Sequence, residues 1–303
     1  MKNFQQKIHL AFKNFTSSTP SLTILQPGKD LKSDHKGFSD PVYLARRHEI
    51  ADIANSFSID SKKIPTITYT SKEHKTWQAV YDLLIPLHTH YACEEHNKNL
   101  VDLQKAGIIT RNLLPQLQPI SEYIQSKTGF RLIPVTGMLT QKDFFALLAH
   151  KMFPATQFIR HHSDPFYSPE PDVVHEILGH MPMLANKDYA NFFQLLGKAS
   201  LGASEKEINS LGNLYLFSVE FGLIKENKNF KIYGAGILSS GKEIMNVNSE
   251  KVRIRQFESE KVVEAYCPLS ALQNQLFWSH NLAEVKEKMT DYVKKMKNGS
   301  CIN

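Results

Sequence analysis

Most hydrophobic residues of this chain recur with the three- to four-residue spacing of amphipathic helices. The clearest stretch begins after Thr70, where the sequence Thr-Ser-Lys-Glu has the form of an N-terminal capping box. Large hydrophobic residues then fall on roughly one helix face: Trp77, Val80, Leu84, Leu87 and Tyr91. Pro86 interrupts this stretch and is expected to kink the helix. A second capping box, which starts at Ser204, predicts another helix.

The same spacing predicts further helices at residues 114–126, 143–153, 187–200 and 282–296. Short runs rich in branched and aromatic residues predict strands at 130–135, 230–233, 252–257 and 275–278. The segment 163–171 contains three prolines, and we expect it to be a stiff, ordered loop. Because helices dominate and most strands come late, the pattern favours one mostly helical α+β domain with a few short strands.

The first 66 residues have a weaker pattern. Phe4, Ile8, Phe12 and Phe15 recur at helical spacing, residues 16–37 are typical of a loop, and a short helix is predicted at 48–57. We therefore divide the chain into a leader (1–66), a main domain (67–297) and a frayed tail (298–303).

Composition narrows the class of protein. The chain has 303 residues, 42% of them hydrophobic, yet it has no run of about 18 apolar residues that would predict a membrane span. The formal net charge of +6 is spread along the chain, whereas nucleic-acid binding favours a concentrated basic stripe. The three cysteines are far apart, which is typical of a reducing compartment. With no signal peptide recognisable, we expect a cytoplasmic protein without membrane or nucleic-acid partners.

The candidate chemistry centres on His175 and His180 in an apolar stretch just after Pro171, where a helix is expected to start. Imidazole is the commonest metal ligand in proteins. On an ideal α-helix, residues five apart point about 140° away from each other. A shared metal would therefore require a local distortion of the helix, which Gly179 would make easier.

A carboxylate completes the set. Glu220 is the one charged residue in the apolar run 214–224, where burial is costly unless the group is paired or bound to a metal. Two histidines and one carboxylate, with coordination positions left open, suit non-haem iron(II) oxygen chemistry.

Other interpretations of these residues remain open at this point. Glu220 could pair with a basic side chain in the core, Asp172 could be a helix N-terminal charge, and Glu176 could face solvent. The adjacent His161 and His162 could be a metal pair, although neighbouring side chains diverge. A zinc hydrolase is disfavoured, because the H-E-x-x-H motif needs its second histidine at the position of Gly179.

Several longer motifs resemble those of the pterin-dependent aromatic amino acid hydroxylases. They lie at residues 128–131, 157–161, 167–180, 218–223 and 233–240, and the similarity runs from about residue 69 to residue 296. The resemblance implies that the main domain is a catalytic domain that uses iron(II), a tetrahydropterin and O₂ to hydroxylate the ring of an aromatic amino acid. It also implies that the fold is that of this family.

The resemblance assigns roles position by position. The iron ligands would be His175, His180 and Glu220. The pterin site would be formed by Gly137, Met138, Leu139, Gln141, Phe144, Glu176 and Tyr215, among which Glu176 and Tyr215 are the candidate catalytic side chains. The amino acid substrate would meet Arg160, Tyr167, Ser168, Pro171, Asp172, Leu216, Gly236 and Ser239. Within this set, Arg160 would bind the substrate carboxylate and Asp172 would support Arg160.

One departure from the family pattern bears on the substrate. Leu216 stands where members of the family usually have a bulky aromatic residue beside the substrate ring, so a looser pocket is expected. Phenylalanine is the first choice of substrate, and tryptophan or a broad specificity is the alternative. A homologue that binds amino acid or pterin without catalysis is a further hypothesis. The chain resembles the bacterial enzymes, which lack the regulatory domain and tetramerisation helix of the animal enzymes, so we expect a monomer or a weak dimer.

Overall fold

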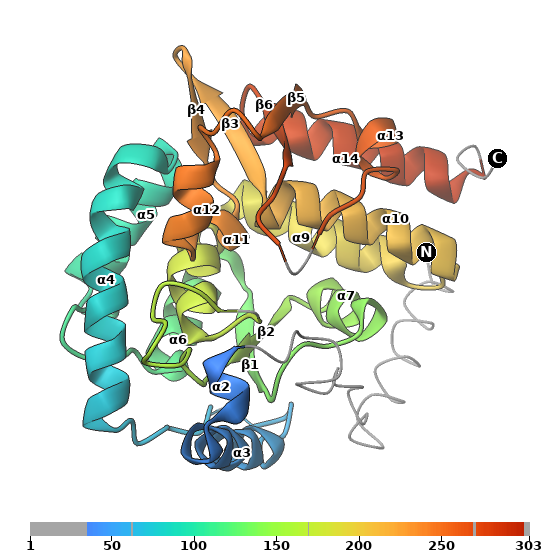
Figure 1. Cartoon of the computed structure of the whole chain (residues 1–303). Helices are drawn as coiled ribbons and strands as arrows, with labels where there is room; N and C mark the ends of the chain where they lie inside the picture. The colour runs from blue at the N-terminus through green and yellow to red at the C-terminus, as the bar shows by residue number, and fades with distance from the viewer. Residues whose placement is uncertain (1–34, 62, 169, 269–270, 300–303) are drawn as a thin grey trace.

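The structure is a computed structural model that describes residues 35–61, 63–168, 170–268 and 271–299 (Figure 1). Within these residues, helices dominate and the strands are short, so the prediction of one mostly helical α+β domain is confirmed. No helix among the described residues combines the length and the apolar character needed to cross a membrane. Of the cysteines in this part of the chain, Cys93 and Cys267 are both free thiols.

Three long helices pack together around the centre of the fold. They are α9 (Lys187–Ser200), α10 (Glu205–Tyr215) and α14 (Leu282–Lys297), and α9 contacts both of the others (Figure 1). The shorter α7 (Gln141–Ala149) packs against the remaining side of α9, where Phe192 and Phe193 are fully buried. The predicted bounds 187–200 of α9 are those of the structure, and the Ser204 capping box starts α10 as predicted.

A second group of helices is built on α4 and α5, which lie along one edge of the molecule (Figure 1). It comprises α4 (Ser71–Tyr91), α5 (Glu94–Lys105), α6 (Leu117–Thr128), α8 (Met181–Leu184) and α12 (Gly241–Asn246). The capping box at Thr70 forms as predicted, and Trp77, Val80 and Leu84 are buried. Pro86 lies inside α4 without ending it. The hydrophobic pattern did not predict α5, because polar residues occupy most of its length.

Two small sheets complete the scaffold. Strands β1 (Arg131–Val135) and β2 (Met152–Thr156) pair in parallel. A second sheet has the order β4-β3-β6-β5, built from β3 (Gly222–Glu226), β4 (Asn229–Ile232), β5 (Arg253–Gln256) and β6 (Gln275–Ser279). The predicted helix 143–153 is too long, because Lys151 takes a positive φ of 56° that ends the helical segment and starts β2.

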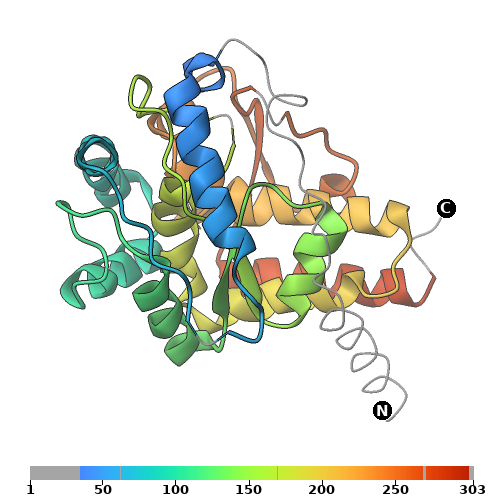
Figure 2. The same cartoon turned by 90° about the horizontal axis from the view of Figure 1, so that it is seen from below.

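The described part of the leader forms α2 (Lys36–Ser39) and α3 (Pro41–Asn55), which pack on each other, and α3 contacts β1 (Figure 2). The predicted helix at 48–57 starts too late, since Asp40 caps α3 and Pro41 occupies its first position. The predicted loop 16–37 also ends too late, because α2 already begins at Lys36. The predicted helical pattern from Phe4 to Phe15 lies outside the described residues, and the domain division at residue 66 stays a prediction.

Two π-helical segments, η1 (His175–His180) and η2 (Leu216–Glu220), lie on either side of the short helix α11 (Ala235–Leu238). The contacts are too close for side chains at several points. A β-carbon on Gly179 would lie 2.8 Å from the carbonyl oxygen of Ala235, and one on Gly236 would lie 2.8 Å from the Phe221 ring. Helix α11 therefore holds both π-helical segments in position. A further short helix, α13 (Ser259–Val262), packs on α14.

Candidate metal centre

The distortion that a shared metal requires is present as a π-helical turn. In η1, the backbone N–H of Met181 donates to the carbonyl of Glu176, five residues earlier. This wider turn brings positions i and i+5 toward the same side of the helix. Pro182 favours the change, because it has no N–H to donate to the carbonyl four residues before it and its ring would clash there. The role foreseen for Gly179 differs from the observed one, which is close packing on α11.

The second π-helical turn places the carboxylate. In η2, the N–H of Phe221 donates to the carbonyl of Leu216 over 2.9 Å, again five residues earlier. The Ser218 hydroxyl donates to the carbonyl of Leu214, a bond within the helix that is typical of bent segments. Glu220 ends η2, and its carboxylate lies beside the two histidines of η1.

The three predicted ligands converge on one another. The Nε2 atoms of His175 and His180 are 2.9 Å apart. Glu220 lies 3.5 Å from the first and 3.2 Å from the second, through its two carboxylate oxygens. His180 is almost fully buried, whereas His175 and Glu220 each keep 9% of their surface exposed. The cluster is therefore enclosed by protein on one side and open on another.

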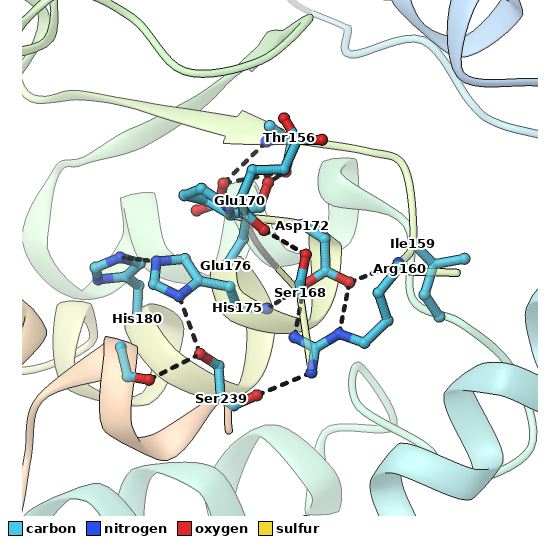
Figure 3. Close-up of polar contacts among 12 residues, drawn as sticks. Thr156, Ile159, Arg160, Ser168, Glu170, Asp172, His175, Glu176, His180 and Ser239 are labelled. Carbon is cyan, nitrogen blue, oxygen red and sulfur yellow. Dashed lines mark hydrogen bonds and ion pairs between the residues drawn. The ribbon is translucent and has the colours of Figure 1, made fainter. Parts of the chain in front are cut away.

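Hydrogen bonds select the protonation state of His175 (Figure 3). Its Nδ1 lies 3.0 Å from the Ser239 hydroxyl, which itself donates to the carbonyl of Gly236 over 3.4 Å. Because the hydroxyl proton is engaged there, Nδ1 of His175 carries the hydrogen and donates to Ser239. The lone pair is then left on Nε2, which faces the other two ligands. A second hydrogen-bond partner on the remote nitrogen is typical of metal-bound histidine.

Electrostatics keep His175 and Glu220 in forms that bind cations. Burial lowers the pKa of His175 to about 4, so its ring is neutral at physiological pH. Burial alone would raise the pKa of Glu220, but the two histidines and the Tyr215 hydroxyl outweigh it and lower that pKa to about 2. For His180, burial opposes protonation, yet the Glu220 carboxylate raises its pKa above the usual value. A bound cation would take the place of that proton.

The donor set fits a divalent iron ion. Nitrogen and oxygen ligands bind such metals at about 2 Å, and adjacent donors around one ion at that distance are separated by about 3 Å, close to the separations of 2.9, 3.2 and 3.5 Å seen here. Two histidines and one carboxylate that occupy one face, with the other positions open, are typical of non-haem iron(II) oxygenases. Among the described residues, this is the one group of three or more potential ligands that could hold a metal.

The candidate pterin residues gather next to the metal ligands. The rings of Phe144 and Tyr215 meet edge to face with centroids 5.0 Å apart. Phe153 lies between Phe144 and His180, with centroids 6.3 and 4.9 Å from theirs. The half-buried Phe144 therefore presents an aromatic face close to the metal ligands, a surface on which a flat heterocycle can stack.

The loop before α7 supplies the remaining pterin candidates. Gly137 is buried, Met138 and Leu139 are half-buried, and Gln141 is exposed at the start of α7. Gln141 lies so close to Gly212 of α10 that a β-carbon there would be 2.4 Å from the side-chain nitrogen. The start of α7 and α10 thus meet at Gly212, one helical turn before Tyr215.

Glu176 is buried, and its side chain is hydrogen-bonded to Thr156 at the end of β2 (Figure 3). One carboxylate oxygen accepts from both the backbone N–H and the hydroxyl of Thr156, each over 3.2 Å. Burial raises the pKa of Glu176 to about 7. A carboxyl group with such a pKa can both hold and release a proton at neutral pH.

Arg160 and Asp172 form a buried ion pair on the other side of the centre (Figure 3). The guanidinium donates to both carboxylate oxygens, over 2.9 and 2.7 Å, and the backbone N–H of Arg160 donates to the same carboxylate over 2.7 Å. Another guanidinium nitrogen donates to the backbone carbonyl of Ser239 over 3.0 Å. Asp172 supports Arg160 as the resemblance implied, and it also accepts from the N–H of His175 over 3.2 Å.

The other substrate candidates surround this pair less tightly. The Ser168 hydroxyl donates to the carbonyl of Glu170, and the carbonyl of Pro171 accepts from the Thr156 hydroxyl over 3.3 Å. Tyr167 is half-buried beneath the Lys242 ammonium, which lies 5.2 Å from the ring centroid. The half-buried Leu216 begins η2, and Gly236 lies against its end. The hydrogen bonds therefore join Arg160 with Asp172 and Ser239, three of the eight candidates.

The leader contributes side chains to this region that the pattern did not predict. Arg47 of α3 forms a buried ion pair with Glu170, and its guanidinium lies 3.9 Å from the centroid of the Phe158 ring. The Tyr43 hydroxyl donates to the carbonyl of Ile159 over 2.8 Å. A small cavity lies between α3 and the segment that carries Arg160. The sequence did offer one signal here: Asp40-Pro41 is typical of a helix start, and it could have indicated that Arg47 lies in an ordered helix.

Some contacts at the centre were also missed. Ser239 was assigned to the substrate, whereas its side chain holds His175. Tyr215 was assigned to the pterin, and it also hydrogen-bonds to Glu220. Thr156, which holds Glu176, was not singled out at all. Ser239 lies 64 positions from His175, Tyr215 lies 5 positions from Glu220, and Thr156 lies 20 positions from Glu176. The sequence carried little indication of these contacts.

Comparison with known proteins agrees with the geometry. A family model described as "Biopterin-dependent aromatic amino acid hydroxylase" matches residues 17–302. Phenylalanine-4-hydroxylase from Bos taurus is 41% identical over 270 residues, which cover 89% of this chain and 60% of that protein. Tyrosine 3-monooxygenase from Homo sapiens is 43% identical over 267 residues, with 88% and 50% covered. Tryptophan 5-hydroxylase from Xenopus laevis is 41% identical over 271 residues, with 89% and 56% covered.

The match to these relatives is partial in length, since the chain spans between half and three-fifths of each. A solved structure covers more. Phenylalanine hydroxylase from Chromobacterium violaceum, crystallised with iron(III) and the oxidised cofactor 7,8-dihydrobiopterin, superimposes with a TM-score of 0.71 at 26% identity. The superposition covers 82% of this chain and 92% of that one. The fold and the ligand geometry thus point to the same family.

Proposed function

The chain belongs to the biopterin-dependent aromatic amino acid hydroxylase family, and we propose that it is an iron(II)- and tetrahydropterin-dependent monooxygenase that hydroxylates the ring of an aromatic amino acid with O₂. The convergence of His175, His180 and Glu220 carries this proposal. When bound there, iron(II) together with the pterin supplies the activation of O₂ that ring hydroxylation requires.

The side chains around the centre divide the remaining work. Ser239 keeps the lone pair of His175 directed at the metal position. Phe144 offers the stacking surface for the pterin, and Glu176, whose pKa burial raises to about 7, can hold a proton beside it. Arg160 binds the carboxylate of the amino acid through its guanidinium, which Asp172 holds in place. Arg160, Glu176, His180 and Ser239 are buried, which limits the access of water to the reacting groups.

Relatives named for phenylalanine, tyrosine and tryptophan are similarly identical to the chain, so sequence identity does not select among the three amino acids. We propose phenylalanine as the substrate, with tryptophan or a broad range as the second candidate because of Leu216. A Leu216→Trp variant should narrow the range and favour phenylalanine, because the larger ring fills space beside the substrate. Equal or broader turnover of tryptophan by this variant would contradict the assignment.

One experiment tests the reaction. The purified chain is loaded with iron(II), supplied with tetrahydrobiopterin and O₂, and assayed in parallel for products from phenylalanine, tyrosine and tryptophan. We expect ring hydroxylation of at least one, at a rate that falls to background when iron is removed by a chelator. Zinc loading is the matched control and should give no hydroxylated product; a hydrolytic activity that is present with zinc but absent with iron(II) would favour a zinc hydrolase instead.

The remaining assignments stay proposals. We propose that the protein works in the cytoplasm as a monomer or weak dimer, with no nucleic-acid or membrane partner. A non-catalytic homologue that senses amino acid or pterin is the alternative function. Binding of phenylalanine without any iron-dependent product in the assay above would support that alternative.

A further inference from the structure

A second pair of histidines is buried behind the metal centre, outside every role described so far. His88 of α4 and His96 of α5 are both fully buried. Nδ1 of His88 lies 3.3 Å from Nε2 of His96, and the rings meet edge to face with centroids 5.0 Å apart. On its other side, Nε2 of His88 lies 2.6 Å from the backbone carbonyl oxygen of Leu238. The pair therefore reaches the end of α11.

The position of each hydrogen in this pair follows from its partners. A carbonyl oxygen only accepts, so Nε2 of His88 must carry a hydrogen and donate to Leu238. Burial lowers the pKa of His88 to about 4, so the ring is neutral and its Nδ1 is an acceptor. Nε2 of His96 must then donate to that Nδ1. The two bonds point in one direction, from α5 through α4 to α11.

The far side of this chain of bonds is the active region. Leu238 is followed directly by Ser239, whose hydroxyl accepts from His175 and whose carbonyl accepts from Arg160. Helix α11 has only four residues, and its own hydrogen bonds cannot fix the orientation of its last carbonyls. The bond from His88 is the one that ties this end of α11 to the long helix α4.

We propose that His88, oriented by His96, is a positioning residue that sets the placement of Ser239 and thereby of both the metal ligand His175 and the substrate-binding Arg160. This inference rests on the proposed function for the identity of the two ligands, iron(II) and an aromatic amino acid. It predicts that loss of the His88 bond weakens both ligands together, although His88 touches neither.

The test compares three variants of the full chain. His88→Phe keeps a ring but removes both nitrogens, and His88→Gln keeps an N–H that can donate to Leu238. Val80→Ala is the matched control, because Val80 is buried on the same helix and its loss destabilises the core without touching α11. For each, the Kd values for iron(II) and for L-phenylalanine are measured by titration, with the Kd of tetrahydrobiopterin and the Tm as references.

We expect His88→Phe to raise the Kd values for iron(II) and L-phenylalanine by about five- to tenfold, as the loss of one buried hydrogen bond implies. The Kd of tetrahydrobiopterin should stay within about twofold, because the candidate pterin residues other than Glu176 lie on α7, in the loop before it and on α10, and Glu176 is held by Thr156 of β2. His88→Gln should restore both affected values, and Val80→Ala should lower the Tm alone. Unchanged Kd values in His88→Phe, or equal increases in Val80→Ala, would overturn the proposal.

A fallback covers a variant that fails to fold. His96→Leu leaves the bond from His88 to Leu238 possible but removes the donor that orients the His88 ring, so a smaller change in the same two Kd values is expected. No change in either value would count against the proposal. The iron titration needs no turnover, so the outcome can be read even if the wild-type chain hydroxylates none of the three amino acids, which would instead contradict the proposed function.

Discussion

The protein buries two pairs of histidines with similar geometry and different surroundings. In the first pair, Nε2 of His175 and Nε2 of His180 lie 2.9 Å apart and both face Glu220. In the second pair, Nε2 of His96 faces Nδ1 of His88 at 3.3 Å, and no carboxylate in the described part of the chain is hydrogen-bonded to either ring. The first arrangement points two lone pairs at one position, whereas in the second the lone pair on Nδ1 of His88 accepts from the N–H of His96.

The difference teaches that burial alone does not make histidines a metal site. Burial lowers the pKa of His88 and of His175 alike, to about 4 in each case. What distinguishes the metal centre is the anionic oxygen of Glu220 and the direction of the ring nitrogens. The end of α11 then connects the two pairs, because Leu238 accepts from His88 and Ser239 accepts from His175.

Removing a ligand should give the largest contrast between the pairs. We expect His180→Ala to lose iron(II) binding, with turnover reduced by more than about 1000-fold, well beyond the 10- to 100-fold typical of residues behind the ligands. Metal content by elemental analysis and product formation measure the two effects. In the matched variant His96→Gln, iron should still bind at one per chain when iron is saturating. Equal metal loss in both would remove the distinction.

The ion pair beside the first histidine pair should come next. Asp172→Asn leaves the Arg160 guanidinium buried with a weaker partner, so we expect the KM for the amino acid to rise by about 100-fold. The iron affinity should fall less, since Asp172 contacts only the backbone of His175. Steady-state kinetics and iron titration separate the two. Asp82→Asn, which weakens an exposed pair with Arg111, is the control and should leave both values unchanged.

Ser239→Ala should have an intermediate effect on the metal. The variant removes the acceptor for Nδ1 of His175, and we expect iron(II) affinity to fall by about 10- to 100-fold. The KM for the amino acid should change less, because Arg160 bonds to the backbone of Ser239. Ser240→Ala, which removes only the N-cap of α12, is the comparison. An iron affinity that is lowered equally in both would mean that the effect is general loosening of the loop.

The smallest effect concerns stability against pH. The folded-state pKa of His88 is below its unfolded value, about 4 against 6.5, so the unfolded chain binds more protons between these values. The stabilisation is therefore complete above pH 6.5 and is lost as the pH falls toward 4. Replacing this titrating group in His88→Gln should reduce that decline by on the order of 1 kcal/mol per pH unit. Urea unfolding at pH 7, 6 and 5 measures it, and an unchanged slope would contradict it.

The sequence predicted the regular elements well where a local signal marks them. The capping boxes at Thr70 and Ser204 start helices as expected, because a cap depends on residues a few positions apart. Helix ends were harder to predict. The helix that begins at Gln141 stops near Ala149 through a left-handed residue, Lys151, which hydrophobic spacing does not reveal. The start of α3 at Asp40 and Pro41 had a signal that the weak pattern of the leader obscured.

The candidate site could be predicted in its residues more than in its contacts. The five-residue separation of His175 and His180 required a departure from the α-helix, and the structure shows it as a π-helical turn. The sequence did not reveal that Glu220 lies in a second π-helical turn. Over only five residues, the spacing of side chains in a π-helix hardly differs from that in an α-helix. The bonds of Ser239 and His88 join segments 64 and 150 positions from their partners, so they depend on the assembled fold.

Ser239 has a thermodynamic consequence for the proposed enzyme. Its hydroxyl supports the metal-binding histidine while its own carbonyl supports the arginine for the amino acid, so one residue is shared by two binding equilibria. Whatever factor the metal adds to the affinity for the amino acid, the amino acid must add to the affinity for the metal. If that factor exceeds one, the enzyme retains its iron more firmly while the amino acid is bound than while it is absent.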